Sequence, residues 1–290
     1  MSVAVARRSV AADVIALGKP RITFMVLVTT TAGLLLAPGA VSPPLMIATL
    51  LGVALIVAGA NALNMYLERD VDALMTRTRN RPLPAGRLAP ELALYFGVAC
   101  AAVSVPLLAV LVNPLTGFLA ALSLVLYVLA YTPLKRRSTA ALIVGAIPGA
   151  MPPLLGWTAA TGSLSAPGIA LFLILFVWQL PHFIAISIFR VDEYTRAGLK
   201  VVPAVRGLAA AKQQIALYSL LMVAVSLQVF RAGIGGAFYV AAALALGGGL
   251  VTLAAYGLGR AGDSRWARWY FFYTLVYLPS LLMALAVSHR

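Results

Sequence analysis

The sequence predicts an all-α protein that crosses a membrane several times, and two features carry this prediction. Hydrophobic residues make up 62% of the 290 residues, only 10% are charged, and the mean hydropathy is +0.97. Soluble domains carry about 25% charged residues. The second feature is that long uncharged segments separate the charged residues, as expected for helices that span a bilayer.

Nine transmembrane helices fit these uncharged segments. Three segments of more than 40 residues lack Asp, Glu, Lys and Arg, at 22–67, 92–134 and 138–189. A spanning helix needs roughly 20 apolar residues, so each segment accommodates two helices. Each also contains a turn sequence: "APGAVSPP", "VNPLTG" and "TGSLSAPG". Three shorter uncharged segments fit one helix each, at 213–230, 232–259 and 269–289.

The basic residues indicate how these helices are oriented. With a cytoplasmic N-terminus, 20 of the 22 lysines and arginines fall on the cytoplasmic side, and only Arg231 and Arg290 fall outside. All eight acidic residues also fall inside. This bias follows the positive-inside rule. We therefore expect a multi-pass cell-membrane protein whose N-terminus and charged loops are cytoplasmic and whose C-terminus is outside.

The net charge of +14 does not indicate a nucleic-acid-binding protein, because the basic residues lie in short loops between predicted helices. In that position they suit contact with anionic membrane lipid. The single cysteine, Cys100, excludes an intramolecular disulfide. Residues 1–20 have no convincing small-residue cleavage site and are interpreted as a cytoplasmic amphipathic lead-in.

Two predicted cytoplasmic loops, 68–91 and 190–212, are long and contain acidic residues, whereas the others are short and basic. In both, acidic residues come first, and basic residues and proline follow. The first loop contains Glu68, Asp70, Asp72, Arg77, Arg79, Arg81 and Pro82. The second contains Asp192, Glu193, Arg196, Lys200, Pro203 and Arg206. The shared order is consistent with an ancient duplication, and it makes both loops candidates for a functional site.

Three oxygen-bearing side chains near the first loop share one face of a predicted helix. At about 100° per residue, Asn64, Glu68 and Asp72 fall within an arc of about 80°, while Asp70 points elsewhere. Such oxygens are ligands that Mg²⁺ prefers, and the ion usually binds one or two carboxylates together with substrate phosphates. The arginines that follow supply bidentate donors for phosphate oxygens. The combination predicts a site for a magnesium diphosphate.

The alternative is a solvated helix end whose acidic residues pair with the nearby arginines. The second acidic loop argues against it. So do Asn61 and Asn64, because polar groups within a membrane are costly without partners. The arginines of "RTRNR", at 77–81, have a comparable alternative, which is anchoring to lipid alone.

The pattern Asn64-x-x-x-Glu68-x-x-x-Asp72 resembles the first acidic motif of the UbiA superfamily of intramembrane prenyltransferases, whose members have nine transmembrane helices. Other stretches are similar to the haem-farnesylating branch of that superfamily. They are "GKPRITF" at 18–24, "ERDVDALMTRTRNRPLP" at 68–84, "GAMPPLLGW" at 149–157, "WQLPHFIAISIFR" at 178–190 and "DEYTRAG" at 192–198. The resemblance covers nearly the whole chain, in order.

This resemblance implies one prenyltransferase domain, residues 1–290, with its helices around a central cavity. It implies that Mg²⁺ held by both acidic motifs binds farnesyl diphosphate, and that loss of the diphosphate leaves an allylic cation. A vinyl group of haem b then attacks the cation, and water addition gives haem O for terminal oxidase assembly. Haem A synthase or a terminal oxidase assembly factor is an implied partner.

Carried over position by position, the resemblance assigns roles to both acidic clusters. The implied catalytic and metal-binding residues are Asn64, Glu68, Asp72, Asp192 and Glu193. The implied diphosphate contacts are Arg77, Arg81, Lys135 and Arg136. Two positions depart from the pattern. Glu68 stands where the family usually has Asp, and Arg196 stands where the second motif of the superfamily often has Asp, which weakens the prediction of a metal in the second loop. The role of Asp70 stays open.

His182 has two interpretations. Eleven residues of helix would separate it from Glu193 by roughly 16 Å, which disfavours a shared metal. The residue is either a haem contact, through the iron or a propionate, or a histidine that packs helices or handles protons.

Two other functions remain alternatives. One is another UbiA-type enzyme that prenylates a quinone precursor, a chlorin or a lipid alcohol, although "WQLPHF" and "GAMPPLLGW" favour haem. The other is a transporter whose acidic residues bind a coupling ion. Transporters carry such residues near the bilayer midplane, whereas here they gather at one interface, which disfavours transport.

Overall fold

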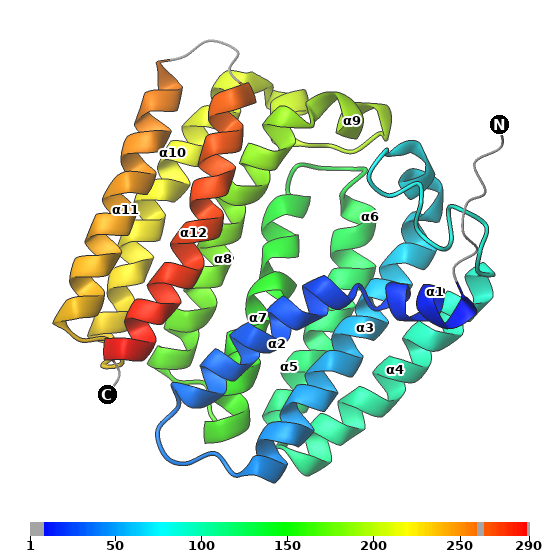
Figure 1. Cartoon of the computed structure of the whole chain (residues 1–290), viewed down its shortest axis with the longest axis horizontal. Coiled ribbons are helices and arrows are strands. Elements are labelled where there is room, and N and C mark those ends of the chain that lie inside the picture. Colours follow the sequence, from blue (N-terminus) through cyan, green and yellow to red (C-terminus); the bar gives the residue numbers. More distant parts are fainter. Residues whose placement is uncertain (1–8, 260–263, 289–290) are drawn as a thin grey trace.

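The computed structural model describes residues 9–259 and 264–288, and these residues form helices and connecting loops without any strand (Figure 1). Residues 1–8 of the predicted lead-in, and Arg290, lie outside the described residues. The elements are α1 (Val10–Leu17), α2 (Pro20–Leu35), α3 (Pro43–Leu74), α4 (Pro90–Leu111), α5 (Pro114–Val125), the π-helix η1 (Leu126–Tyr131), α6 (Thr132–Leu134), α7 (Ala141–Thr161), α8 (Ala166–Phe189), α9 (Val191–Arg196), α10 (Val202–Arg231), α11 (Ala237–Leu258) and α12 (Ser264–Ser288).

By length and composition, eight helical segments of the described chain can cross a membrane. They are α3, α4, the continuous segment Pro114–Leu134 (α5, η1 and α6), α7, α8, α10, α11 and α12. The apolar helix α2 has 16 residues and therefore rises only about 24 Å. With α2 as a short ninth helix, the predicted polytopic all-α architecture is confirmed.

Prolines mark the start of several of these helices. Pro20, Pro43, Pro90 and Pro114 are the first residues of α2, α3, α4 and α5. The first turn of a helix has no intrahelical partner for its N–H groups, so proline loses nothing there and its fixed φ favours the helical turn. The turn sequences recognised in the uncharged segments thus contain the residues that begin the next helix.

Helices that follow one another in the chain pack side by side, and α12 returns to pack against α8 (Figure 1). The exception is α2, which crosses obliquely and packs on α7 as well as on α3. Glycines allow the close approach of α2 and α7. A Cβ on Gly33 would collide with the carbonyl oxygen of Pro153, and one on Gly156 would collide with that of Thr30. Small residues let helix backbones approach in this way.

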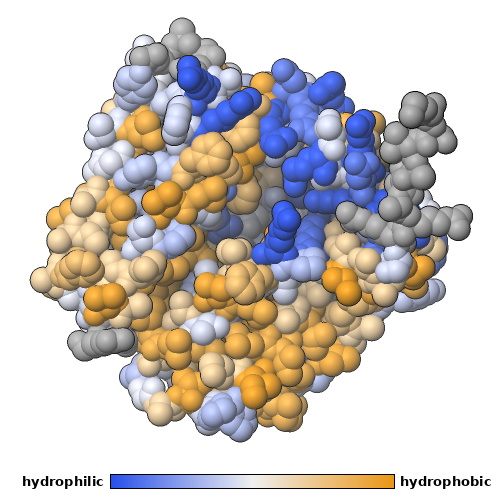
Figure 2. Space-filling model, in the orientation of Figure 1, coloured by the Kyte–Doolittle hydropathy of each residue, from blue (hydrophilic) through white to orange (hydrophobic). Residues whose placement is uncertain are grey.

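The loops that carry most of the charge lie together at one end of the bundle, here called the charged end, formed by residues 75–89, 135–140 and 190–201 (Figure 1). Helix α1 lies there as well. The buried carboxylate of Asp13 accepts hydrogen bonds from Nε and an Nη of Arg87, at 2.9 and 3.0 Å, which ties α1 to the loop after α3. Figure 2 shows hydrophilic residues around a hollow at this end and a mostly hydrophobic surface toward the other.

Candidate active site

A cavity of about 450 Å³ lies inside the bundle, between α2, α3, η1, α7 and α8. The central cavity implied by the resemblance is therefore present. Its lining is divided. Polar side chains line the part at the charged end: Lys19, Asn61, Asn64, Glu68, Asp72, Arg77, Arg81 and Lys135. The walls farther along α3 and α7 are apolar and include Val53, Ile56, Met151 and Leu155. Such a cavity suits a ligand with a charged head and an apolar tail.

Helix α3 carries the predicted oxygen stripe into this cavity. Asn64, Glu68 and Asp72 all line it, and the amide of Asn64 donates to Oε2 of Glu68 at 2.8 Å. Asn64 and Asp72 are 2% and 1% exposed, whereas the side chain of Asp70 is 81% exposed and lies 4.0 Å from Arg69. The stripe expected from the helical period is therefore formed, and Asp70 points away from it as predicted.

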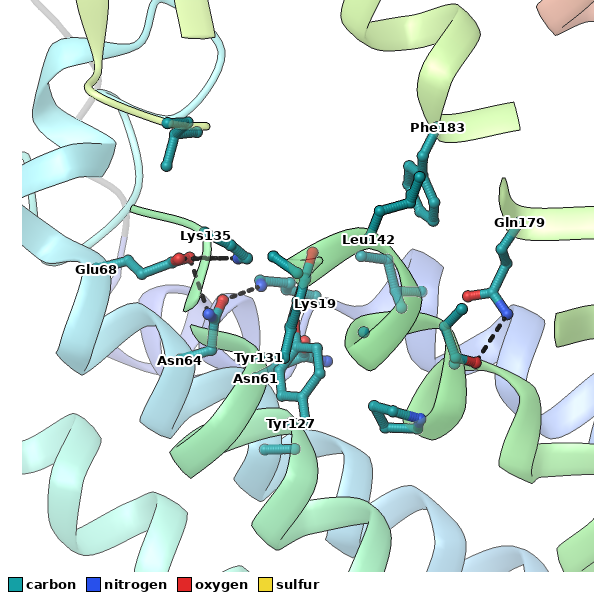
Figure 3. Close-up of a pocket in the computed structure, with 18 of the residues that line it drawn as sticks. Lys19, Asn61, Asn64, Glu68, Tyr127, Tyr131, Lys135, Leu142, Gln179 and Phe183 are labelled. Atoms are coloured by element: carbon teal, nitrogen blue, oxygen red, sulfur yellow. Dashed lines mark hydrogen bonds and ion pairs between the residues drawn. The ribbon is translucent and has the colours of Figure 1, made fainter. Parts of the chain in front are cut away.

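Each oxygen-bearing side chain of the stripe contacts a basic side chain, and Figure 3 shows the contacts of Glu68 with Lys135 and of Asn64 with Lys19. Lys135 Nζ lies 2.8 Å from Oε1 of Glu68, and Arg81 lies 2.6 Å from Oδ2 of Asp72. Lys19 donates to Oδ1 of Asn64 at 3.1 Å. The acidic and basic groups come from α3, from the loop after it, from the start of α2 and from the end of α6. Oxygen-bearing side chains, which suit Mg²⁺, and basic side chains, which suit phosphate, therefore alternate around the mouth of one cavity.

Lys19 is a site residue that the sequence reasoning missed. It is the one described non-glycine residue with a left-handed backbone, at φ 48°, a conformation that costs roughly 1–2 kcal/mol for an L-residue. The turn directs its ammonium group toward Asn64. Burial, together with repulsion from Arg81 and Lys135, lowers the pKa of Lys19 to about 7. The signal available in the sequence was a basic residue directly before the proline that begins a helix.

A π-helix forms the wall beside Lys135. Its residues Tyr127 and Tyr131 line the cavity, and Lys135 Nζ lies 4.4 Å from the centre of the Tyr131 ring. Thr132 donates to the carbonyl oxygen of Tyr127 at 2.8 Å and accepts from Asn64 at 3.1 Å, which couples the irregular turn to the stripe on α3. Short π-helical segments inside α-helices occur frequently at functional sites.

Burial alone would lower the pKa of Lys135, but the neighbouring Tyr131 and Glu68 raise it above its usual range. Lys135 therefore keeps its positive charge at neutral pH, as a diphosphate contact must.

The opposite wall of the cavity comes from α7 and α8. Figure 3 shows Gln179 and Phe183 facing Glu68 and Lys135 across the cavity. The amide of Gln179 donates to the carbonyl oxygen of Leu175 at 2.9 Å. Prolines 148 and 152 of α7 also line the cavity. Proline removes a helical hydrogen bond, and neighbouring protein satisfies the freed backbone groups where such helices line a cavity.

The second acidic loop meets the first but forms a different structure. Glu193 accepts from the backbone N–H of Arg77 at 3.3 Å and pairs with Arg190 at 2.9 Å. A second link joins the backbone N–H of Lys200 to the carbonyl oxygen of Lys135, at 2.8 Å. Burial would raise the pKa of Glu193, but the Arg77 N–H and the Arg190 guanidinium lower it.

The remaining predicted residues are divided between the cavity and the surface. Arg77 and Arg81 line the cavity, whereas Arg136 is exposed and does not. Asp192 is exposed and lines a second cavity together with Glu193. Within residues 9–259 and 264–288, no three His, Cys, Asp or Glu side chains come together as a metal site. The structure therefore does not join the two acidic motifs into one carboxylate cluster.

His182 lies in a packed aromatic environment beside the cavity. Its Nδ1 lies 2.7 Å from the hydroxyl of Thr274, and its ring stacks on Trp178 with centroids 4.5 Å apart. Phe271 is 4.9 Å away, centroid to centroid. Contacts of this kind are expected for a histidine that packs helices together. A contact between His182 and haem stays a prediction.

The donor set fits Mg²⁺ only in combination with a phosphate ligand. Asn64, Glu68 and Asp72 supply an amide oxygen and two carboxylates along one helix face. Mg²⁺ commonly binds one or two carboxylates, keeps several waters and takes substrate phosphates as further ligands. The surrounding Lys19, Arg81 and Lys135 are cations that could supply donors to such phosphates.

Comparison with known proteins identifies related chains. The model of the UbiA prenyltransferase family matches residues 26–276. Protoheme IX farnesyltransferase of Sorangium cellulosum is 55% identical over 249 residues, which cover 86% of this chain and 89% of that protein. Protoheme IX farnesyltransferase of Myxococcus xanthus is 50% identical over 280 residues, covering 97% and 95%.

Solved structures share the fold at low sequence identity. A digeranylgeranylglyceryl phosphate synthase aligns with a TM-score of 0.83 and 15% identity, over 96% of this chain and 98% of that one. A UbiA homologue from Archaeoglobus fulgidus bound to DMAPP and Mg²⁺ aligns with a TM-score of 0.65 and 16% identity, over 95% and 99%. These similarities concern the arrangement of the helices.

Proposed function

Because the chain belongs to the UbiA prenyltransferase family, we propose that it transfers the farnesyl group of farnesyl diphosphate to a vinyl group of haem b, with water addition that gives haem O. The names of the relatives that are 50–55% identical support the substrates. The observation that carries the chemistry is the cavity mouth, where three oxygen ligands on α3 alternate with three basic side chains above an apolar chamber.

The proposed diphosphate site is built from groups that already contact one another. Asn64, Glu68 and Asp72 would hold Mg²⁺, while Arg81 and Lys135 turn from their carboxylate partners toward the diphosphate oxygens. Charge-assisted hydrogen bonds from these donors are short and strong. When bound, Mg²⁺ neutralises charge on the diphosphate and makes it a better leaving group. The binding of DMAPP and Mg²⁺ by a UbiA homologue of the same fold supports metal-dependent binding of a prenyl diphosphate.

The apolar part of the cavity would hold the farnesyl chain. When the bond between the allylic carbon and the diphosphate oxygen breaks, the electron pair leaves with the diphosphate, where Lys19, Arg81 and Lys135 stabilise the negative charge. Tyr127 and Tyr131 are the aromatic residues on this wall, and aromatic faces attract a neighbouring cation. Exclusion of water by Val53, Ile56 and Met151 protects the allylic cation until it reacts.

The vinyl group of haem b would then donate its electron pair to the allylic carbon and form the new carbon–carbon bond. The positive charge moves to the vinyl carbon next to the porphyrin ring. Water adds to that carbon, and its proton is released, so that the product carries a hydroxyethylfarnesyl group. No oxidant or reductant is needed.

The second loop has a supporting part in this proposal. Glu193 holds the backbone of Arg77 beside the cavity and so connects the two loops. Metal binding by Asp192 and Glu193 and diphosphate binding by Arg136 stay predictions. We also infer that the charged end faces the cytoplasm, and that haem A synthase or an oxidase assembly factor receives the product.

The test is to express the full chain in a membrane that supplies haem b and to analyse the extracted pigments by mass and by pyridine-haemochrome spectrum. We expect farnesylated haem whose formation depends on farnesyl diphosphate. A prenylated quinone precursor, chlorin or lipid alcohol in its place would move the assignment within the family. The absence of any prenylated product in the presence of both substrates would contradict the proposal.

A further inference from the structure

A second cavity of about 790 Å³ lies at the charged end, between α8, α9 and the first turns of α12. Its size falls within the roughly 300–1,000 Å³ typical of sites for small ligands. Four phenylalanines line it: Phe183, Phe189, Phe271 and Phe272. Four arginines line it as well: Arg77, Arg190, Arg196 and Arg268. The diphosphate chemistry proposed above uses the first cavity and leaves this one unassigned.

Three of these phenylalanines contact one another, and two arginines lie over one of their rings. Phe271 contacts both Phe189 and Phe272, with ring centroids 5.8 and 5.3 Å apart. The guanidinium carbons of Arg190 and Arg268 lie 5.9 and 5.7 Å from the centre of the Phe189 ring. A ligand in this cavity would therefore have an apolar, aromatic body and negative groups that reach the arginines.

The net charge of the residues that line this cavity also indicates a negatively charged ligand. Four arginines face two acidic residues, Asp192 and Glu193, which leaves two positive charges in excess. Glu193 pairs with Arg190, but Arg268 makes no ion pair within the described part of the chain. Guanidinium groups match carboxylates through paired hydrogen bonds. Two excess arginine charges beside an aromatic lining suit an aromatic molecule that carries two carboxylates.

The two cavities are adjacent, and Arg77, Phe183 and Tyr194 line both. Phe183 lies across the first cavity from Glu68 and Lys135 (Figure 3). A flat ligand held by carboxylates in the second cavity would thus direct its opposite edge toward the place where the diphosphate leaves. In haem b the two propionates and the two vinyl groups occupy opposite edges of the porphyrin.

We propose that the second cavity binds the acceptor porphyrin. Arg196 and Arg268 bind its propionates, Phe189 and Phe271 pack against the ring, and a vinyl edge points past Phe183 into the first cavity. This inference rests on the proposed function for the identity of the porphyrin. An anionic phospholipid is the competing occupant, but its flexible chains do not require an aromatic lining, and a single phosphate diester carries one negative charge where the lining has two positive charges in excess.

The test is an absorbance titration of the purified full chain in phosphatidylcholine nanodiscs, with haem b and with its dimethyl ester, in which both propionates are masked. We expect haem b to bind the wild-type protein more tightly than the ester does. Arg268→Gln is expected to raise the Kd of haem b about tenfold, the lower end of the range for hydrogen bonds to charged groups. The Kd of the ester should not change.

Two further variants accompany Arg268→Gln. Arg196→Gln, on the exposed face of α9, should act in the same direction. Arg137→Gln is the matched control, because it removes a positive charge from the charged end at an exposed residue that lines neither cavity. The Kd of haem b for Arg137→Gln, and the affinity for farnesyl diphosphate of all three variants, should match wild type.

The proposal is overturned if Arg196→Gln and Arg268→Gln bind haem b as wild type does, or if they weaken haem b and its ester equally. It is also overturned if phosphatidylglycerol stimulates wild type but not Arg268→Gln while the Kd of haem b is unchanged, because the cavity would then bind lipid headgroups. The proposed function fails separately, when the wild-type protein forms no farnesylated haem. Product formation with no change in haem affinity in the variants would remove the porphyrin site alone.

Discussion

The two acidic loops have the same order of residue types but different structures. In the first, Glu68 and Asp72 lie on α3, which continues to Leu74, and they face the first cavity. In the second, α8 ends at Phe189, and Asp192 and Glu193 belong to the separate six-residue helix α9 beside the second cavity. The acidic residues thus share one face toward the first cavity in the loop whose helix continues through them, and they do not in the loop whose helix ends before them.

Local chemistry accounts for this difference. The end of α3 is stabilised by Thr78, whose hydroxyl donates to the carbonyl oxygen of Asp72 at 2.8 Å. Helix α8 is interrupted at Arg190, which has φ −121° and ψ 18°. Asp192 and Glu193 then occupy the first turn of α9, where negative charge favours the start of a helix. The acidic residues of the second loop thus stabilise the start of a helix, whereas those of the first loop lie near the end of α3.

The largest effect is expected for Asp72→Asn, which keeps the shape of the side chain but removes the charge that faces Arg81. We predict a fall in kcat of at least about 100-fold, the scale expected when a group that organises charge stabilisation is lost. Product formation in nanodiscs measures it, and thermal unfolding checks that the variant is folded. Asp70→Asn, on the exposed side of the same helix, is the matched control and should keep full activity. Equal activity of the two variants would contradict the claim that Asp72 is needed for activity and Asp70 is not.

Lys135→Gln should have the next largest effect. It removes the cation 2.8 Å from Glu68, so we predict a rise of about tenfold or more in the KM for farnesyl diphosphate, on the scale of one hydrogen bond to a charged group. The KM for haem b should not change. The control is Arg136→Gln, which alters the exposed neighbour. A variant of Arg136 that impairs diphosphate binding as much as Lys135→Gln would show that the exposed arginine also enters the site.

Glu193→Gln tests the contact between the two loops. The amide still accepts from the Arg77 N–H but loses the ion pair with Arg190, so we predict a decrease in kcat/KM of about fivefold or less, the range of a partly exposed ion pair. Steady-state kinetics with varied farnesyl diphosphate measures this change. A loss as large as that of Asp72→Asn would mean that Glu193 contacts the reacting groups directly.

The smallest effect is expected for Asp192→Asn. The side chain is exposed and lines only the second cavity, so we predict a change in kcat/KM of less than about twofold, as for most exposed charges. The same kinetic assay applies. A 100-fold loss here would show that both acidic motifs act on the diphosphate, and the contrast between the loops would disappear.

Much of the fold was predictable because it depends on composition and periodicity. The uncharged segments predicted the helices, and the turn sequences with their prolines predicted where helices begin. The 3.6-residue period predicted that Asn64, Glu68 and Asp72 share one face. The rest depends on contacts between distant segments. The packing of α2 on α7 joins segments more than 100 residues apart, and no local pattern in the sequence predicts it.

The candidate site was predictable to the same extent. The acidic stripe, Arg81 and Lys135 were recognised, but Lys19 reaches Asn64 across 45 residues of chain through a left-handed turn. The π-helix that places Tyr127 and Tyr131 has no simple sequence signal. The second cavity combines residues of the first loop, α8, α9 and α12. Its aromatic and basic residues are far apart in the sequence, so only the folded chain identifies it.

The most direct test of the central claim is isothermal titration of farnesyl diphosphate into the purified chain, with Mg²⁺ and with EDTA. Wild type and Asp192→Asn are expected to bind equally with Mg²⁺ and to lose most of their affinity with EDTA, whereas Asp72→Asn should bind weakly under both conditions. Binding by Asp72→Asn that matches wild type with Mg²⁺, or wild-type binding that EDTA does not change, would contradict the assignment of the α3 stripe as the magnesium diphosphate site.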